Sequence, residues 1–543
     1  MFGEGPRQAG PGLPCAAAIA VVAVALRCWR ISWGLSGNTR YLGFPDEVVS
    51  WLPYVRDFIP LSCSSFDQLT LNYPTLYGYL VGLTTSLLHT LGVITVADPG
   101  HPYLHPSPAA LLVARGVSVA ASLVTVGIVG LTAGRMFSRR AGFMAAAFMA
   151  VVPFEVLYTH IASPDILLTT WFAATMLFSY LVAVGSGPWL AVAAGFAAGA
   201  AAATKYTGLA AVVAVGAAIA ERTLRDRSVR RGGTLLGLAL AGFGVAAFLG
   251  CPPCVLHPDR MLSAIRTLAG VTTHYSALHN DILSPTVGWY ARPYLYQLVA
   301  SLPFVLGWPM YALALAGIAL AVRRHTVADR ILFAVAAPYF LVMAGSMLVY
   351  PRYLLPLLPA LVILAAGAAD SIRSRRMRTV VLAGVWLYSL AFAGSQVARF
   401  SFDQQREVAR WVSEAAGGRA SDEVRVGVPR MIMDYYRLTG PFAEKGLRLV
   451  ELEDGHWFDA PPDFFVLPEW YEIAIERDMP GSPVSADLDK LRSGAAGYRQ
   501  TARWSSWYLQ REFYTALDPA FAADLWQGEI GFTVYDRLAS VGP

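Results

Sequence analysis

Apolar runs long enough to cross a bilayer dominate the first 396 residues of this sequence. They lie near residues 13–33, 110–134, 141–159, 166–184, 189–204, 205–220, 233–250, 294–321, 331–349, 353–369 and 379–396. A spanning helix needs about 20 mostly apolar residues, so these runs predict a polytopic bundle of about eleven spanning helices. With 55% hydrophobic and only 15% charged residues, the chain has the composition of an integral membrane protein. Its net charge of +5 comes from arginines in short loops, which gives no reason to expect nucleic-acid binding.

One further run, residues 72–92, decides the predicted topology. If it does not cross the membrane and the N-terminus is cytoplasmic, the basic loops at 135–140, 221–231, 323–324 and 373–378 all lie inside. If it does cross, all four lie outside, against the positive-inside rule. Residues 72–92 are therefore predicted to form a surface-lying or re-entrant helix.

This topology gathers ionisable and aromatic side chains on the non-cytoplasmic face. They are Asp46, Glu47, His101, His105, His160, Asp165, Lys205, Tyr206, the loop 251–292, Tyr350 and Arg352, together with everything after about residue 396. Ionisable residues gathered at one membrane depth in so apolar a chain indicate a functional site.

The adjacent acids Asp46 and Glu47 stand closest to the first predicted span. The stretch that follows them carries apolar residues at three- and four-residue intervals, from Val48 to Ile59. That spacing predicts a second helix in the interface plane. Acids held there are well placed to act on a substrate that itself lives in the bilayer.

The tail, residues 397–543, alternates helical and extended patterns. DQQREVARWVSEAAG and MIMDYYRLTG predict helices, and VRVGV, LRLVEL, DFFVLPEW and YRQTARWSSWYL predict strands. A small soluble α/β domain on the extracytoplasmic side is expected. Its many Trp and Tyr residues could pack a core or stack on sugars, and core packing is the commoner use.

Eight motifs in order resemble a known superfamily. They are an apolar span ending in Arg27, Pro-Asp-Glu at 45–47, NYPTLYGYL at 72–80, LLVARGVSVAASLV at 111–124, RMFSRRAG at 135–142, HIASPDILLTTWF at 160–172, ATKYTGL at 203–209 and PRYLLPLLPAL at 351–361. Together they are similar to the glycosyltransferase C superfamily, in particular to protein O-mannosyltransferases and aminoarabinose-transferase-like enzymes of glycosyltransferase family 39 and its neighbours. The resemblance covers residues 13–396 and leaves the tail without an assigned motif.

The resemblance implies an enzyme of the plasma (inner) membrane that moves a sugar, mannose or a related one, with inversion. The donor would be a polyprenyl-phosphate sugar and the acceptor an extracytoplasmic protein, glycolipid or polysaccharide. A base for the acceptor hydroxyl is then required. Asp46 is assigned this role by its place in Pro-Asp-Glu, with Glu47 orienting the acceptor or tuning its neighbour. A second acid that faces this pair is implied at Asp165. Helix capping is the competing interpretation for all three acids.

Cations are required for the leaving phosphate. Lys205 and Arg352 each interrupt an apolar run, and the resemblance assigns the cations of these motifs to the donor phosphate, with Tyr206 and Tyr353 beside them. Each cation could instead anchor the membrane interface. A transporter or flippase of lipid-linked sugars is the rival function, although no internal repeat supports it.

Cofactors are not required by these motifs. The external histidines could hold a divalent metal together with an acid, but no zinc-ligand spacing is present. Cys251 and Cys254 form a CPPC sequence, for which a local disulfide and two free thiols are both plausible. No metal-binding residue is therefore assigned.

Overall fold

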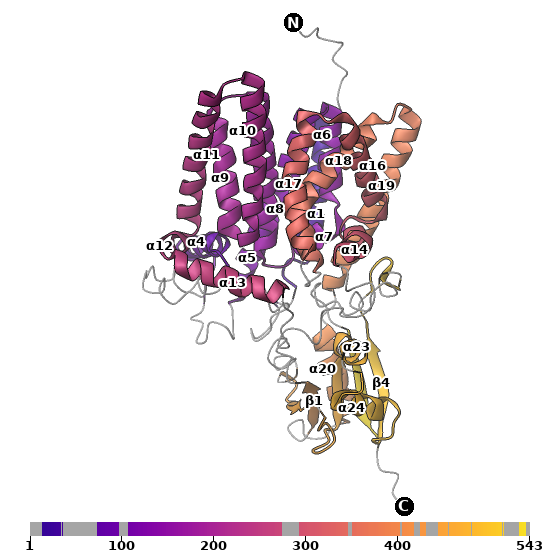
Figure 1. Ribbon diagram of the computed structural model, residues 1–543. Coiled ribbons are helices and arrows are strands. Elements are labelled where there is room, and N and C mark those ends of the chain that lie inside the picture. The colour runs from indigo at the N-terminus through magenta and orange to yellow at the C-terminus, as the bar shows by residue number, and fades with distance from the viewer. Residues whose placement is uncertain are drawn as a thin grey trace, which may run out of the picture.

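The computed structural model describes residues 13–33, 35, 73–96, 107–273, 293–345, 350–401, 404–417, 424–429, 442, 444–453, 455–478, 480–505, 507–512, 514 and 531–538. Asp46, Glu47, His101 and His105 lie outside these residues, and so does the predicted interface helix after Asp46. Within the described part the chain consists of a helix bundle and a smaller domain that contains a sheet (Figure 1).

Long helices and shorter helical segments make up the bundle (Figure 1). They are α1 (Leu13–Cys28), α5 (Pro108–Met136), α6 (Arg139–Ala150), α7 (Pro153–Tyr158), α8 (Pro164–Val184), α9 (Trp189–Thr204), η2 (Tyr206–Ala211) running into α10 (Val212–Asp226), α11 (Val229–Gly250), α14 (Pro293–Tyr296), η4 (Gln297–Ser301), α15 (Leu302–Leu306), α16 (Trp308–Arg324), α17 (Val327–Ala344), η5 (Pro351–Leu357), α18 (Leu358–Ser371) and α19 (Arg375–Ala398). Each apolar run predicted to span corresponds to one or more of these elements.

The predicted count of eleven spans is not confirmed. Among the described residues, seven helices are long and apolar enough to cross a membrane, or eight if Tyr294–Leu306 and Trp308–Arg324 form one span bent by 118°. The bend falls at Gly307, whose φ of +79° favours glycine. The run 141–159 also breaks, because Pro153 cannot donate the hydrogen bond that would continue α6. Hydropathy alone detects neither break.

Small residues set the closest helix packing, between α9 and α11. A Cβ built on Gly195 would lie 1.9 Å from the carbonyl oxygen of Ala239, and one on Gly242 would lie 2.1 Å from that of Val192. Only glycine permits this approach, which is typical of packing between membrane helices.

Three short helices lie at the lower end of the bundle in Figure 1: α4 (Leu76–Thr90), α12 (Pro252–Leu256) and α13 (Pro258–Thr273). In Figure 1, α4 is seen nearly end-on, whereas α9 and α11 beside it run lengthwise. It is held there by Thr75, which donates to the carbonyl of Gly250 at 2.7 Å, and by Tyr77, which donates to that of Ala114 at 3.0 Å. This orientation is that of the surface helix predicted within residues 72–92.

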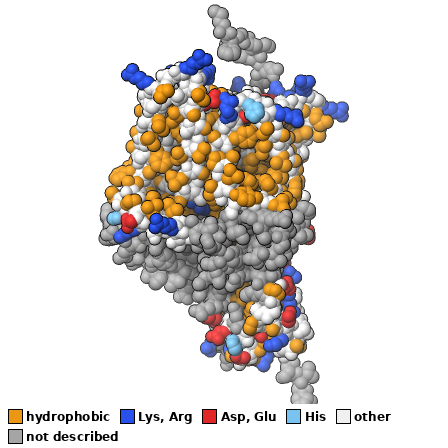
Figure 2. All heavy atoms as spheres, viewed as in Figure 1, with side chains coloured by type: hydrophobic (Ala, Val, Ile, Leu, Met, Phe, Trp, Pro, Cys, Tyr) orange, Lys and Arg blue, Asp and Glu red, His pale blue; other side chains and the backbone are white. Residues whose placement is uncertain are grey.

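Basic side chains gather at the other end of the bundle, which we call the basic end (Figure 2). It contains Arg135, Arg139, Arg230, Arg323, Arg324, Arg375 and Arg376, at the helix ends between α5 and α6, α10 and α11, α16 and α17, and α18 and α19. The C-terminal domain lies beyond the opposite end. The grouping is what the parity of the basic loops predicts. The positive-inside rule predicts that this end is cytoplasmic.

Thiol labelling in intact cells tests this sidedness. With Cys15, Cys28 and Cys63 replaced by serine, Arg230→Cys is expected to stay unlabelled by a membrane-impermeant reagent, and Asp489→Cys to react. Permeabilised cells supply the control, since both cysteines should then react. Labelling of position 230 in intact cells would reverse the orientation and place the candidate site inside.

The C-terminal domain is built on a five-stranded sheet of order β2-β1-β3-β5-β4. Its strands are β1 (Arg425–Pro429), β2 (Arg448–Leu452), β3 (Phe464–Pro468), β4 (Tyr498–Trp504) and β5 (Phe532–Arg537), and its described helices of ten or more residues are α20 (Gln404–Ala415), α23 (Glu469–Asp478) and α24 (Pro483–Arg492). β1 pairs in parallel with β2 and β3, and β5 pairs antiparallel with β3 and β4. The four predicted strands are confirmed, β5 was not predicted, and the predicted helix MIMDYYRLTG lies outside the described residues. Trp457 is 1% exposed in the core of this domain, so it packs rather than binding sugar.

Two tyrosines that follow the predicted boundary at residue 396 pack in the core of the bundle. Tyr508 and Tyr514 return from the sheet domain and pack in the core of the bundle, where the Tyr514 hydroxyl donates to the carbonyl of Pro303 at 3.1 Å. Phe392 of α19 stacks on Tyr514 with ring centroids 6.0 Å apart. Tyr508 and Tyr514 therefore fasten the C-terminal domain to α15 and α19.

Candidate functional site

An ion pair between Asp165 and Lys205 lies at the end of the bundle opposite the basic end. Asp165 is the second residue of α8, and its Oδ1 is 2.7 Å from the Lys205 Nζ. The Asp165 side chain is 5% exposed and the Lys205 side chain 13%. The pair joins the start of α8 to the break between α9 and η2, where Lys205 is the extended residue (φ −156°).

Ser163 rather than Asp165 caps α8. The Ser163 hydroxyl accepts from the backbone N–H of Asp165 at 3.3 Å and donates to its Oδ2 at 2.8 Å. The serine satisfies the first backbone donor, which leaves the carboxylate to bind Lys205. Helix capping is the competing interpretation of Asp165 from the sequence. In the structure, Ser163 has this role.

Arg352 brings a second cation to the same place from η5. Its Nη1 donates to the Tyr158 hydroxyl of α7 at 3.3 Å, and its guanidinium carbon lies 5.0 Å from the ring centroid of Tyr350. The ring of Tyr353 lies 5.8 Å from Arg352 and 5.1 Å from the Lys205 ammonium. Tyr353 thus lies close to two cations that are 147 residues apart in the chain, and Asp165 is within electrostatic range of both.

Four of the residues predicted to form the site are therefore brought together: Asp165, Lys205, Arg352 and Tyr353. Tyr73, at the start of the segment that holds α4, joins them with its ring 5.9 Å from the Lys205 Nζ. Cation and aromatic ring attract each other because the ring face is negative. Tyr73 could have been suspected from sequence, since it lies in the NYPTLYGYL motif.

Tyr206 packs on a different side of the Lys205 turn. Its hydroxyl is 3.9 Å from the Cys254 Sγ, in a small cluster with Ala203 and Cys251. Cys251 and Cys254 form a disulfide at the start of α12, which decides between the alternatives that the CPPC sequence left open. The phosphate-binding role assigned to Tyr206 stays a prediction.

A second buried cluster was not predicted from the sequence. Arg27 of α1 and Glu155 of α7 form an ion pair in which both side chains are fully buried. Ser122 of α5 donates to Glu155 and accepts from Arg27. The signal was present, because Glu155 is an ionisable residue inside an apolar run and such residues find partners.

Arg27 also forms hydrogen bonds with backbone carbonyls that have no helical partner at the break before α7. The carbonyl of Met149 would normally accept from residue 153, which is a proline without an N–H. Arg27 donates to this carbonyl at 3.1 Å and to that of Ala150 at 2.8 Å. The guanidinium thus satisfies the orphan acceptors at the end of α6.

The chain that leaves α1 is held in place by further contacts. Arg115 of α5 donates to the carbonyls of Ile31 at 2.9 Å and Trp33 at 2.7 Å. The His160 Nε2 lies 2.9 Å from the carbonyl of Trp29. Burial lowers the pKa of His160 to about 4, so its ring is neutral near pH 7 and serves as a hydrogen-bonding group. These contacts position the point from which the chain runs on toward Asp46 and Glu47.

Helix α7 connects the two clusters, since Glu155 pairs with Arg27 and Tyr158 accepts from Arg352.

The described residues contain no group of three His, Cys, Asp or Glu side chains that could hold a metal ion. The arrangement that they do contain is one carboxylate and two cations around aromatic rings. Such a site can bind a phosphate group by charge-assisted hydrogen bonds.

A family model described as dolichyl-phosphate-mannose-protein mannosyltransferase matches residues 109–249, from α5 to the end of α11. No curated protein sequence matches the chain.

Solved structures resemble the fold at low sequence identity. ArnT from Cupriavidus metallidurans bound to undecaprenyl phosphate is 14% identical, with 98% of this chain and 100% of that one covered and a TM-score of 0.46. The Archaeoglobus fulgidus oligosaccharyltransferase tethered with an acceptor peptide is 12% identical, with 86% and 71% covered and a TM-score of 0.50. The S. cerevisiae protein O-mannosyltransferase Pmt1-Pmt2 complex is 18% identical, with 49% and 38% covered and a TM-score of 0.30. The family model thus confirms, over residues 109–249, the resemblance of this multi-pass membrane protein to protein O-mannosyltransferases that its sequence predicts. The likeness to the solved structures is one of fold alone.

Proposed function

We propose that this protein is an inverting glycosyltransferase that moves a sugar, mannose or a related one, from a polyprenyl-phosphate donor to an extracytoplasmic acceptor. The observation that carries the proposal is the convergence of Lys205 and Arg352 on Tyr353, with Asp165 paired to the lysine. A site with two cations at the end of a membrane bundle suits a phosphate whose lipid tail remains in the bilayer. The description of the family model that matches residues 109–249 names a donor of this class.

The proposed reaction is one displacement at the anomeric carbon. The acceptor hydroxyl attacks from the face opposite the phosphate, its oxygen bonds to the anomeric carbon, and the bond from that carbon to the phosphate oxygen breaks. Asp46 accepts the hydroxyl proton, and Glu47 orients the acceptor. The bond electrons leave with the polyprenyl phosphate, which gains one negative charge.

Lys205 and Arg352 would stabilise that charge as it develops. The planar guanidinium can hold two phosphate oxygens at once, and Lys205 supplies a compact charge. Asp165 positions the ammonium group through its 2.7 Å contact. Because this corner of the bundle is largely buried, each interaction is stronger than it would be in water.

A direct test is a reaction between the purified full-length protein and a panel of radiolabelled polyprenyl-phosphate sugars, with release of polyprenyl phosphate measured. Transfer or hydrolysis of one donor in detergent supports an enzyme. A protein that moves lipid-linked sugars across vesicle membranes while breaking no glycosyl bond would support the rival transporter instead.

Substitution of Arg352 tests the phosphate site. Arg352→Ala is expected to weaken donor binding by roughly 10- to 100-fold, since a hydrogen bond to a charged group contributes about 1.5 to 3 kcal/mol. Arg352→Lys should lose less donor affinity, because lysine keeps the positive charge and lacks only the planar guanidinium that can bind two phosphate oxygens. Equilibrium binding of the donor measures both.

Arg373→Ala is the matched control, an exposed arginine beyond α18 at the basic end, and it should bind donor normally. Wild-type affinity in Arg352→Ala would reduce Arg352 to an interface anchor and leave the proposed site without its main contact.

A further inference from the structure

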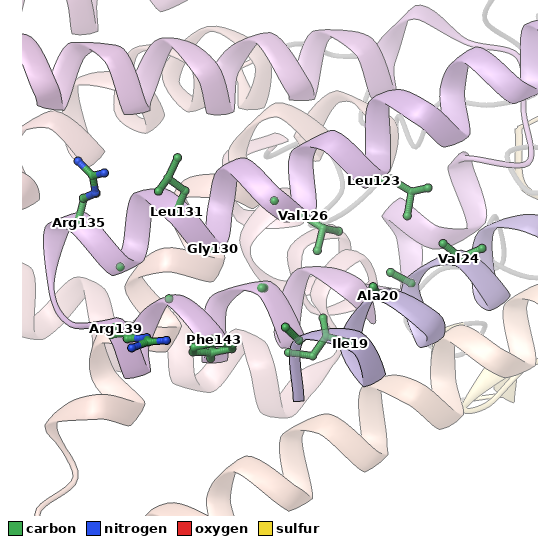
Figure 3. Close-up of a pocket in the computed structure, with 16 residues that line it drawn as sticks. Ile19, Ala20, Val24, Leu123, Val126, Gly130, Leu131, Arg135, Arg139 and Phe143 are labelled. Atoms are coloured by element: carbon green, nitrogen blue, oxygen red, sulfur yellow. The ribbon is translucent and has the colours of Figure 1, made fainter. Parts of the chain in front are cut away.

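A groove of about 620 Å³ opens between α1, α5 and α6. Its walls are almost entirely apolar, with Ile19, Ala20 and Val24 from α1 facing Leu123 and Val126 from α5 (Figure 3). The volume is within the range of ordinary ligand sites. Its exposed Val24 and Leu131 face the surroundings of the bundle, so the groove opens toward the acyl chains of the bilayer.

Small residues account for the shape of the groove. Gly142 of α6 lies so close to α5 that a Cβ on it would be 2.7 Å from the carbonyl oxygen of Gly130. Gly127, one turn away on α5, has no atom within 4 Å of a Cβ built on it. The first contact draws α5 and α6 together, whereas the space beside Gly127 stays open.

Two arginines lie at one end of the groove. Arg135 is in the last turn of α5 and Arg139 is the first residue of α6, and Figure 3 shows both at the end away from Val24. Neither guanidinium has a carboxylate partner among the residues that the structure describes. This is the basic end of the bundle, at the membrane boundary opposite Asp165, Lys205 and Arg352.

We propose that the groove binds an anionic glycerophospholipid, with its phosphate at the end lined by Arg135 and Arg139 and an acyl chain along Ile19, Val24 and Val126. Each part of such a lipid matches one part of the groove. The anionic headgroup meets the two arginines, and the acyl chain meets the apolar walls. Basic pockets between spanning helices recognise anionic headgroups in this way. The ligand and the location differ from those of the proposed donor site.

A second copy of the chain is the other candidate occupant, because small residues also favour helix association. The helices α1, α5 and α6 contain no Asp or Glu. A symmetric contact through this face would therefore set arginines against arginines without a neutralising charge. The charges favour the phospholipid.

The experiment compares bound lipids by native mass spectrometry after exchange into mixed micelles that contain equal phosphatidylglycerol and phosphatidylcholine. Wild-type protein should retain phosphatidylglycerol with roughly tenfold preference, as expected for two arginines beside an anionic surface group. Arg135→Gln/Arg139→Gln should lose the preference, and Arg135→Lys/Arg139→Lys should keep most of it. Gly127→Leu, which fills the groove, should retain little of either lipid.

Gly116→Leu is the matched control, since Gly116 is an exposed glycine of α5 outside the groove and also has no atom within 4 Å of its Cβ position. It should retain lipid as wild type does. Equal retention of both lipids by wild-type protein, or unchanged preference in the double glutamine variant, would overturn the proposal. So would a dimer that Gly127→Leu abolishes, which would assign the groove to a second copy. Thermal stabilisation by inorganic phosphate equal to that by phosphatidylglycerol would indicate an anion site without an acyl chain.

Discussion

Asp46→Asn is expected to lower turnover by roughly 10²- to 10⁴-fold while donor binding survives, as follows from the loss of a general base. Asparagine keeps the size and most hydrogen bonds of aspartate but cannot accept the acceptor proton at neutral pH. Single-turnover kinetics with saturating donor would measure the chemical step, and equilibrium binding would measure the donor affinity separately.

Two further variants make this result specific. Glu47→Gln should cost less than Asp46→Asn, because Glu47 is assigned an orienting role. Asp165→Asn should weaken donor binding as well as turnover, since it removes the charge that holds Lys205 at 2.7 Å. A fully active Asp46→Asn enzyme would remove Asp46 as the base and leave helix capping as its role, because asparagine caps a helix as well as aspartate does.

Glu155→Leu is expected to destabilise the protein by about 3 to 5 kcal/mol, because it leaves the fully buried Arg27 without a counter-charge. The double variant Arg27→Met/Glu155→Leu should recover much of the loss, since apolar residues of similar volume often replace a buried pair at little cost. The recovery should be incomplete, because methionine cannot donate to the carbonyls of Met149 and Ala150. Thermal denaturation of the purified protein would give the order of the three stabilities.

An exposed ion pair provides the control. Glu221 and Arg330 are 2.7 Å apart at the basic end, with side chains 24% and 48% exposed. Glu221→Leu should cost less than about 1 kcal/mol, as surface pairs do. If Glu155→Leu were no more destabilising than Glu221→Leu, the buried pair would not be what holds α1 to α7.

The two predictions connect through α7. Glu155 fixes the end of α1, from which the chain continues toward Asp46, and Tyr158 contacts Arg352 at the proposed phosphate site. A defect at Glu155 should therefore disturb the relative placement of base and phosphate. In a Glu155→Gln protein that still folds, we expect turnover to fall more than donor affinity.

Features that depend on neighbours in the chain could be predicted from the sequence alone. Apolar runs of spanning length became helices, the basic loops gathered at one end, and alternation predicted β1 to β4. The candidate residues Asp165, Lys205 and Arg352 stood out because a charge in an apolar run is costly without a partner. All these signals are local, so one sequence contains them in full.

Tertiary structure decided which of these residues meet. It set Tyr353 close to both cations and Tyr206 against the disulfide, although each tyrosine directly follows a predicted cation. The pairing of Arg27 with Glu155 and the return of Tyr514 to the bundle join residues more than a hundred positions apart. Such contacts depend on how helices pack and where they bend, as at Gly307, and a hydropathy pattern does not encode this. The sequence thus determined the elements and their charges, whereas packing between distant segments determined the geometry of the site.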